Sequence, residues 1–298
     1  MAEQDIPQYI AKVLLEKYLL DRLDFKRLEE TFRFGEEMAS YLPYLTREDQ
    51  ITYYFKMSLH AFNTKRYKQC VELTEIGIEL SREDSELKAR AYIAMINSLL
   101  YLGEYDGAES YLQEFEAFPY DFVQETAELS RACIKAKKKE YDVAIPMLKK
   151  CLNKIRESSR IHVVNDLLEI YLDIGDYTAC AELIEREKEF LTFEPDTPFK
   201  HYSLGLYFHN KAFILTKLKS FEIGKESYLK SLISYGEVNA IPEITACMND
   251  ILSHYTFLLQ QMTKEKALLD DTVVQVSQEL DCYIVKYQQL VQRKYEYK

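Results

Sequence analysis

The sequence predicts an all-α fold: a right-handed superhelical solenoid of helical hairpins that ends in a long C-terminal capping helix. Three observations predict it. The chain has 298 residues but only 8 Gly and 7 Pro, too few turn formers for a sheet-rich fold. Apolar residues make up 47% of the chain and recur at helical spacing, so a sizeable core can form. A short sequence step also repeats along the chain, which is typical of solenoids.

The repeated step is an aromatic residue followed three positions later by a small one. It occurs at Tyr67–Cys70, Tyr105–Ala108, Tyr141–Ala144, Tyr177–Cys180 and Phe221–Gly224, and more weakly at Phe25–Leu28. Gly103 and Gly175 stand two residues before the aromatic in two of the copies. The small residue lets two helices approach closely, and the aromatic fills the wedge at the turn. Each step therefore predicts a helical hairpin, and hairpins must stack because one alone cannot bury its faces.

The predicted elements follow in order along one solenoid, 1–298. Residues 1–45 contain an N-terminal pair of amphipathic helices, over 8–42, that stops at Pro43. Residues 46–240 contain the repeated hairpins, with a loop and a mild hinge near 191–199. Residues 241–298 form the last hairpin and a long helix from Asp271 to Tyr297. This helix either caps the last repeat or makes a homodimer contact.

The step with its glycine resembles the tetratricopeptide repeat. The chain has no Trp, and the sites equivalent to that repeat's characteristic Trp are Tyr54, Tyr92, Val164 and Phe208. Within that superfamily, the chain is similar to bacterial intracellular peptide receptors, the group of Rap, NprR, PlcR and the phage arbitrium receptor. The phrases that carry the likeness are Tyr53–Phe55, Ala144–Leu148 and His209–Phe213. The resemblance implies an extended peptide held in the groove, with asparagine side chains on its main chain.

The concave surface of a solenoid is its natural binding site, because the first helix of each hairpin lines it. An asparagine amide offers one acceptor group and two donors, so it can bind a peptide main chain of any sequence. Aromatic residues beside it would select side chains, and Arg90 could pair with a carboxylate. The predicted peptide-binding residues are Phe55, Asn63, Arg90, Asn97, Tyr101, His162, Asn165, Glu169, His209, Asn210, Phe213 and Asn249.

Composition and motifs argue against several other functions. With 38 basic and 49 acidic residues the net charge is −11, which argues against direct nucleic-acid contact. No apolar stretch approaches the roughly 20 residues that span a membrane, and the start does not read as a secretory signal, so we expect a cytoplasmic protein. Six widely spaced cysteines are expected to be free, buried thiols. No catalytic, metal-binding or cofactor motif is present, so an enzyme, a metal site and a cofactor are not expected.

The predicted function is a peptide-binding regulatory protein of the quorum-sensing type, or the effector domain of one. No helix-turn-helix is readable in residues 1–65, so its output is expected through a trimmed DNA-binding domain or through partner proteins alone. The alternative is a constitutive interaction scaffold that needs no small ligand. A third reading, a response-regulator phosphatase, requires catalytic residues that the sequence does not reveal.

Overall fold

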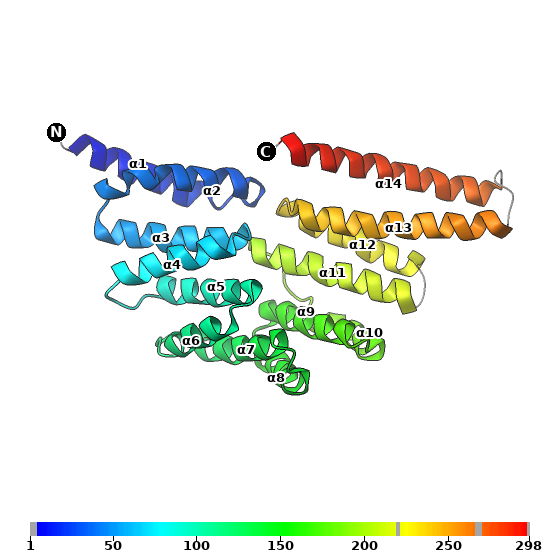
Figure 1. The fold of residues 1–298 in the computed structure, drawn as a ribbon, viewed down its shortest axis with the longest axis horizontal. Helices are drawn as coiled ribbons and strands as arrows, with labels where there is room; N and C mark the ends of the chain where they lie inside the picture. Colours follow the sequence, from blue (N-terminus) through cyan, green and yellow to red (C-terminus); the bar gives the residue numbers. More distant parts are fainter. Residues whose placement is uncertain (1–4, 219–220, 266–269, 297–298) are drawn as a thin grey trace. The chain divides into compact units, whose positions relative to one another are not determined.

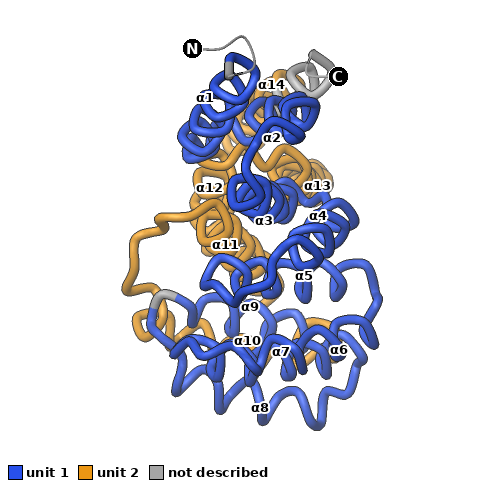
Figure 2. The backbone as a smooth tube through the Cα atoms, turned by 90° about the vertical axis from the view of Figure 1, so that its left-hand side faces the viewer, with its two compact units in different colours: residues 1–170 blue, residues 171–298 orange. Residues whose placement is uncertain are grey.

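The computed structural model describes residues 5–218, 221–265 and 270–296, and over these residues it confirms the predicted all-α fold (Figure 1). Every regular element in that part of the chain is a helix. The chain divides into two compact units, with unit 1 ending at Ile170 and unit 2 beginning at Tyr171 (Figure 2). Each unit consists of helices that pack on their neighbours in sequence, as a solenoid of hairpins requires.

Unit 1 is built from successive antiparallel helices. They are α1 (Asp5–Asp21), α2 (Leu28–Glu37), α3 (Arg47–Asn63), α4 (Tyr67–Leu80), α5 (Glu86–Leu102), α6 (Tyr105–Phe115), α7 (Phe122–Lys137), α8 (Tyr141–Lys154) and α9 (Glu157–Asp173), with 3-10 turns at Phe25–Arg27 and Met38–Tyr44. The predicted N-terminal helices over 8–42 are therefore present as α1 and α2. Pro43 lies inside the second 3-10 turn rather than directly behind an α-helix.

Unit 2 has the same pattern. Its elements are α10 (Tyr177–Glu185), a 3-10 turn at Glu187–Glu189, α11 (Pro198–Leu218), α12 (Phe221–Glu237), α13 (Ile241–Glu265) and α14 (Asp271–Glu296). Of these, α11, α13 and α14 are longer than the α-helices described in unit 1. The long C-terminal helix is thus confirmed, and Tyr297 lies outside the described residues. The predicted loop is irregular over residues 191–197. The boundary between the units falls within α9, so a hinge at 191–199 stays a prediction.

The repeated step marks the start of every second helix from α4 to α12. These helices begin at its aromatic residue: Tyr67, Tyr105, Tyr141, Tyr177 and Phe221. The small residue three positions later is buried in each case, at Cys70, Ala108, Ala144, Cys180 and Gly224. In the weak copy, Phe25 begins a 3-10 turn instead. The interpretation of the step as a hairpin signal is therefore confirmed.

Four hairpin turns and the α12–α13 connection each hold one residue in the left-handed region, two positions before the helix that follows. These residues are Lys65, Gly103, Lys139, Gly175 and Asn239, with φ of 60°, 78°, 61°, 74° and 50°. The next amide then bonds back over five residues, as from Glu104 N to Leu99 O at 2.9 Å and from Glu140 N to Lys135 O at 3.0 Å. This is the Schellman closure of a helix. The sequence revealed only the two glycine turns, although the lysine and asparagine turns have the same form.

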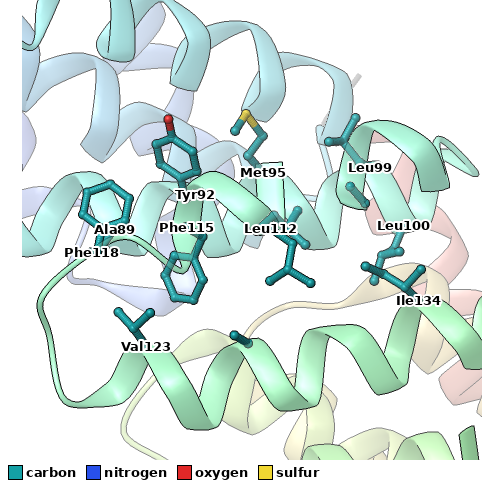
Figure 3. Packing of buried hydrophobic residues seen from close by; sticks show 13 residues of the cluster. Ala89, Tyr92, Met95, Leu99, Leu100, Leu112, Phe115, Phe118, Val123 and Ile134 are labelled. Carbon is teal, nitrogen blue, oxygen red and sulfur yellow. The ribbon is translucent and has the colours of Figure 1, made fainter. Parts of the chain in front are cut away.

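The helices pack through a core that runs along each unit. In unit 1, Met95 and Leu99 of α5 meet Leu112 and Phe115 of α6 in one buried cluster, which Ile134 of α7 also joins (Figure 3). Burial of such side chains contributes about 1.5–3 kcal/mol each.

The thiols only partly follow the prediction. All six cysteines are free, but only four are buried, since Cys133 is half-buried and Cys282 on α14 is exposed. No described helix is long and apolar enough to cross a membrane.

Candidate functional site

The first helices of the hairpins in unit 1, α3, α5, α7 and α9, present the surface on which the sequence places a peptide. On α5, Arg90, Asn97 and Tyr101 share one face, because residues seven and eleven apart nearly coincide around a helix. The Arg90 guanidinium lies over the Phe122 ring of α7, 5.1 Å from its centroid. Tyr101 stacks on Tyr67, with ring centroids 4.5 Å apart. The α5 part of the predicted site is accessible and already ordered by aromatic contacts.

The predicted site residues divide by exposure and by unit. Arg90, Tyr101, Glu169 and Asn249 are exposed, Asn63, Asn97, His162, His209, Asn210 and Phe213 are partly buried, and Phe55 and Asn165 are buried. The first eight in chain order belong to unit 1, and His209, Asn210, Phe213 and Asn249 belong to unit 2.

Phe55 and Asn165 do not line an accessible surface. Phe55 is 0% exposed, and a Cβ atom added to Gly77 of α4 would lie 2.5 Å from its ring, so Phe55 packs between α3 and α4. Asn165 is 6% exposed. The residues one position later, Lys56 and Asp166, are the more accessible ones. The sequence pattern placed the outward face one residue early at these two positions, so it missed Lys56 and Asp166.

A polar cluster joins α7 to α9. The Cys133 thiol donates to Asp166 Oδ2 at 3.2 Å, and Lys137 Nζ lies 2.5 Å from Glu169 Oε1. Burial raises the pKa of Asp166 to about 6, although Cys133 and Lys137 act in the opposite direction. Glu169 is therefore engaged by a lysine, whereas Asp166 takes up a proton only slightly below neutral pH.

The unit 2 candidates lie on α11 and α13. His209 Nε2 lies 2.7 Å from Asp250 Oδ2, so this imidazole connects the two helices. Lys217 Nζ lies 5.5 Å from the centroid of the Phe213 ring. Asn249 is exposed one residue before Asp250. These side chains are held mainly by contacts within unit 2.

A charged and aromatic network holds α12, α13 and α14 together. Lys225 Nζ lies 2.6 Å from Glu279 Oε2, and the Tyr255 hydroxyl donates to the same oxygen at 2.5 Å. These two bonds lower the pKa of the Glu279 carboxyl. Tyr255 also packs on Tyr283, with ring centroids 5.4 Å apart. The outer side of α14 leaves Val285 51% exposed.

A surface hollow of about 400 Å³ lies beside α7. Glu116, Phe118, Tyr120, Val123, Gln124, Ala127, Glu128 and Arg131 line it. Arg131 already forms an ion pair with Glu116 across it. In the described residues, no group of three or more His, Cys, Asp or Glu side chains is arranged to hold a metal ion.

One family model matches the chain. Residues 258–289 match the family described as Spo0E like sporulation regulatory protein. The match covers about a tenth of the chain, from the C-terminal part of α13 into α14. No curated protein matches the chain. The matched family is described as regulatory, which agrees with the predicted regulatory class. The resemblance to tetratricopeptide peptide receptors stays a prediction.

Proposed function

We propose that the chain is a cytoplasmic regulatory protein with two binding surfaces. The first-helix face of unit 1 binds a short extended peptide, and the hairpin of α13 and α14 contacts a protein partner. The observation that carries the regulatory role is the match of residues 258–289 to the sporulation regulator model. The described residues of this match, 258–265 and 271–289, lie on α13 and α14, which pack against each other.

The α13–α14 hairpin has the features of a contact surface. Phe257 and Val285 are 56% and 51% exposed, while Tyr255 and Glu279 fix the helices that carry them. Contiguous apolar patches mark sites where proteins associate, and in this proposal the two side chains contribute to one such patch. A second copy of this chain is the other candidate for this surface, and sedimentation equilibrium distinguishes it from a foreign partner.

A sporulation assay tests the hairpin. The chain is produced in a spore-forming bacterium, and heat-resistant spores are counted with and without it. We expect a severalfold change in the count, and Val285→Asp should abolish it. Val143→Asp on α8 is the matched control, because Val143 is also exposed, at 42%. No change with the wild-type chain, or equal loss with both variants, contradicts the proposal.

The peptide function is supported by the accessible polar groups of α3 and α5. Asn63 on α3 and Asn97 on α5 are partly accessible, and Arg90, also on α5, is exposed. Their amide and guanidinium groups are chemically suited to a peptide main chain and a carboxylate. The competing proposal is a scaffold that binds proteins constitutively.

Native mass spectrometry separates the two proposals. The full chain is measured alone and after incubation with a size-filtered peptide extract of its source culture. Under the receptor proposal, a saturable added mass of a short peptide appears, and it decreases for Asn97→Ala. Absence of any added mass over a concentration series favours the scaffold.

A further inference from the structure

Helix α1 has two apolar faces, one packed into unit 1 and one exposed. On the packed face, Ala11, Leu15 and Tyr18 are fully buried in the core cluster that also contains Phe32 of α2. The Tyr18 hydroxyl lies 3.1 Å from His60 Nδ1 of α3. Through this face α1 packs on α2, α3 and the 3-10 turn that follows α2. The packed face is therefore sufficient to hold α1 in the unit.

The opposite face of α1 carries large apolar side chains where a surface helix ordinarily has polar ones. Since successive residues turn by about 100°, these side chains share one stripe about 100° wide, opposite Ala11 and Leu15. Leu23 extends it beyond the helix, because its amide bonds Leu20 O at 3.1 Å. The six residues, called here the α1 stripe, are between 41% and 69% exposed: Ile6, Tyr9, Ile10, Val13, Leu20 and Leu23.

The spacing within the α1 stripe is that of a helix that pairs with another helix. Ile6, Val13 and Leu20 lie seven residues apart, and Tyr9 and Ile10 fill the positions between the first two. Apolar residues with this heptad spacing form the seam between two helices that lie side by side. The α1 stripe is therefore suited to a second helix rather than to a small molecule.

The charged residues beside the stripe have partners within the chain. Lys17 forms an ion pair with Asp21, and its Nζ lies 4.3 Å from the centroid of the Phe34 ring. Glu16 Oε1 lies 3.2 Å from Lys12 Nζ. Covering the stripe would therefore not bury an unpaired charge, which is the costly outcome for an interface.

The order of residues makes the stripe complementary to itself in one orientation. In an antiparallel pair centred on Val13, Ile6 of each copy faces Leu20 of the other, and Tyr9 faces Lys17. The ammonium group then meets an aromatic ring, which attracts it. In a parallel pair in register, Lys17 would face Lys17 and the like charges would repel. An antiparallel pair about a two-fold axis is also the common symmetry of homodimers, in which the same patch serves both copies.

The exposed area of the stripe matches a weak dimer. A large apolar side chain presents about 150–200 Å² when fully exposed, so six that are about half exposed offer on the order of 600 Å². Two copies would together bury about 1,200 Å², which is at the lower limit for specific stable interfaces. Association is therefore expected to depend on concentration.

We propose that the α1 stripe is a homodimer interface, in which α1 packs antiparallel on α1 of a second copy with Val13 at the two-fold axis. This interface goes beyond the peptide surface and the α13–α14 hairpin, and it does not depend on either of them.

Sedimentation velocity of the full chain over a concentration series tests the interface. We expect a dimer that grows with concentration, and Val13→Asp should lower the association constant at least roughly tenfold. Val143→Asp on α8 and Val285→Asp on α14 are matched controls that should leave it unchanged, since both valines are also exposed. Circular dichroism should show the same helix content in all variants.

A cross-link provides a second measurement that does not require a charge in the stripe. Val13→Cys is made in a Cys282→Ser background and treated with a short bifunctional maleimide. A covalent dimer should form, whereas Ile76→Cys on α4, in the same background, should stay monomeric.

Three results would overturn the α1 interface. The chain could stay monomeric at every concentration, which would leave the stripe to a different occupant. The dimer could be lost with Val285→Asp and kept with Val13→Asp, which would place the contact on α14. The Val13→Cys chain could dimerise in sedimentation without cross-linking, which would place the contact elsewhere.

Discussion

The polar contacts between helices differ in charge between the two units. In unit 1, the Cys133 thiol of α7 donates to Asp166 of α9 at 3.2 Å, and burial raises the pKa of Asp166 to about 6. In unit 2, Lys225 of α12 lies 2.6 Å from Glu279 of α14, and its bond lowers the pKa of that carboxyl. A partly buried carboxyl that bonds a thiol therefore titrates near neutral pH, whereas one that bonds a lysine stays ionised. The following predictions test this difference and the packing of each unit.

The largest expected effect is on the free energy of unfolding, and it distinguishes a core residue of unit 1 from its outward-facing neighbour. Phe55→Ala should lower the free energy of unfolding by about 3–5 kcal/mol, because it leaves a cavity against Gly77. Lys56→Met, the adjacent residue, should leave it unchanged or raise it. Urea unfolding followed by circular dichroism measures both. A small loss of unfolding free energy for Phe55→Ala would show that this ring lies outside the core and would favour it again as a groove residue.

The second effect concerns the carboxyls of the two units, whose pKa values shift in opposite directions. Asp166 has a pKa raised to about 6, so the folded state holds its proton more tightly than the unfolded state. Its contribution to stability is therefore present below about pH 4 and is lost as the pH rises through 6. Asp166→Asn should stabilise the protein at pH 8 by up to about 3 kcal/mol relative to the wild type. A difference that stays constant between pH 4 and 8 would contradict this.

A third, smaller effect is expected at the ion pair of unit 2. Glu279→Gln weakens the bonds from Lys225 and Tyr255 and should cost about 1 kcal/mol at pH 7, since solvent partly screens the pair. Because the pKa of Glu279 is lowered, its contribution to the stability of the folded state is present above its ordinary pKa and is lost on acidification. Chemical denaturation at pH 7 and pH 3 measures it. Equal costs at both pH values would show that the pair does not act through charge.

The smallest effect concerns the hairpin turns. Gly103→Ala should destabilise by about 1 kcal/mol, because a side chain disfavours its φ of 78°. Lys139→Gly should stabilise by about 0.5 kcal/mol, since Lys139 already adopts a φ of 61°. Thermal unfolding of the two variants should shift in opposite directions. Shifts of the same sign would refute the equivalence of the glycine and lysine turns.

The sequence predicted the helices well, because the repeated step contains both residues that define a hairpin locally. Within four residues, Tyr105 marks the start of a helix and Ala108 marks the point where two helices approach closely. No residue distant in sequence is needed to recognise the hairpin. Lys139 could not be recognised as a turn residue, because its left-handed conformation is imposed by the Schellman bonds rather than by its side chain. Local patterns therefore specify the hairpins even where the turn chemistry is unusual.

The candidate site was harder to predict than the fold. Helical periodicity predicts that α3 has an inner and an outer face, but neighbouring positions differ by only about 100°. Whether Phe55 or Lys56 points outward depends on how α3 meets Gly77 of α4, a contact between segments distant in sequence. The family match over 258–289 was also missed, because the apolar period of that segment indicated only a cap or a dimer contact.

Lysine footprinting tests the central claim most directly. The full chain is acetylated briefly with and without a size-filtered peptide extract of its source culture, and each lysine is quantified by mass spectrometry. The peptide function predicts that a bound peptide slows acetylation of Lys56 on the first-helix face of α3 and leaves Lys150 of α8 unchanged. Lys56 acetylation that is unaffected by a peptide shown to bind would contradict it.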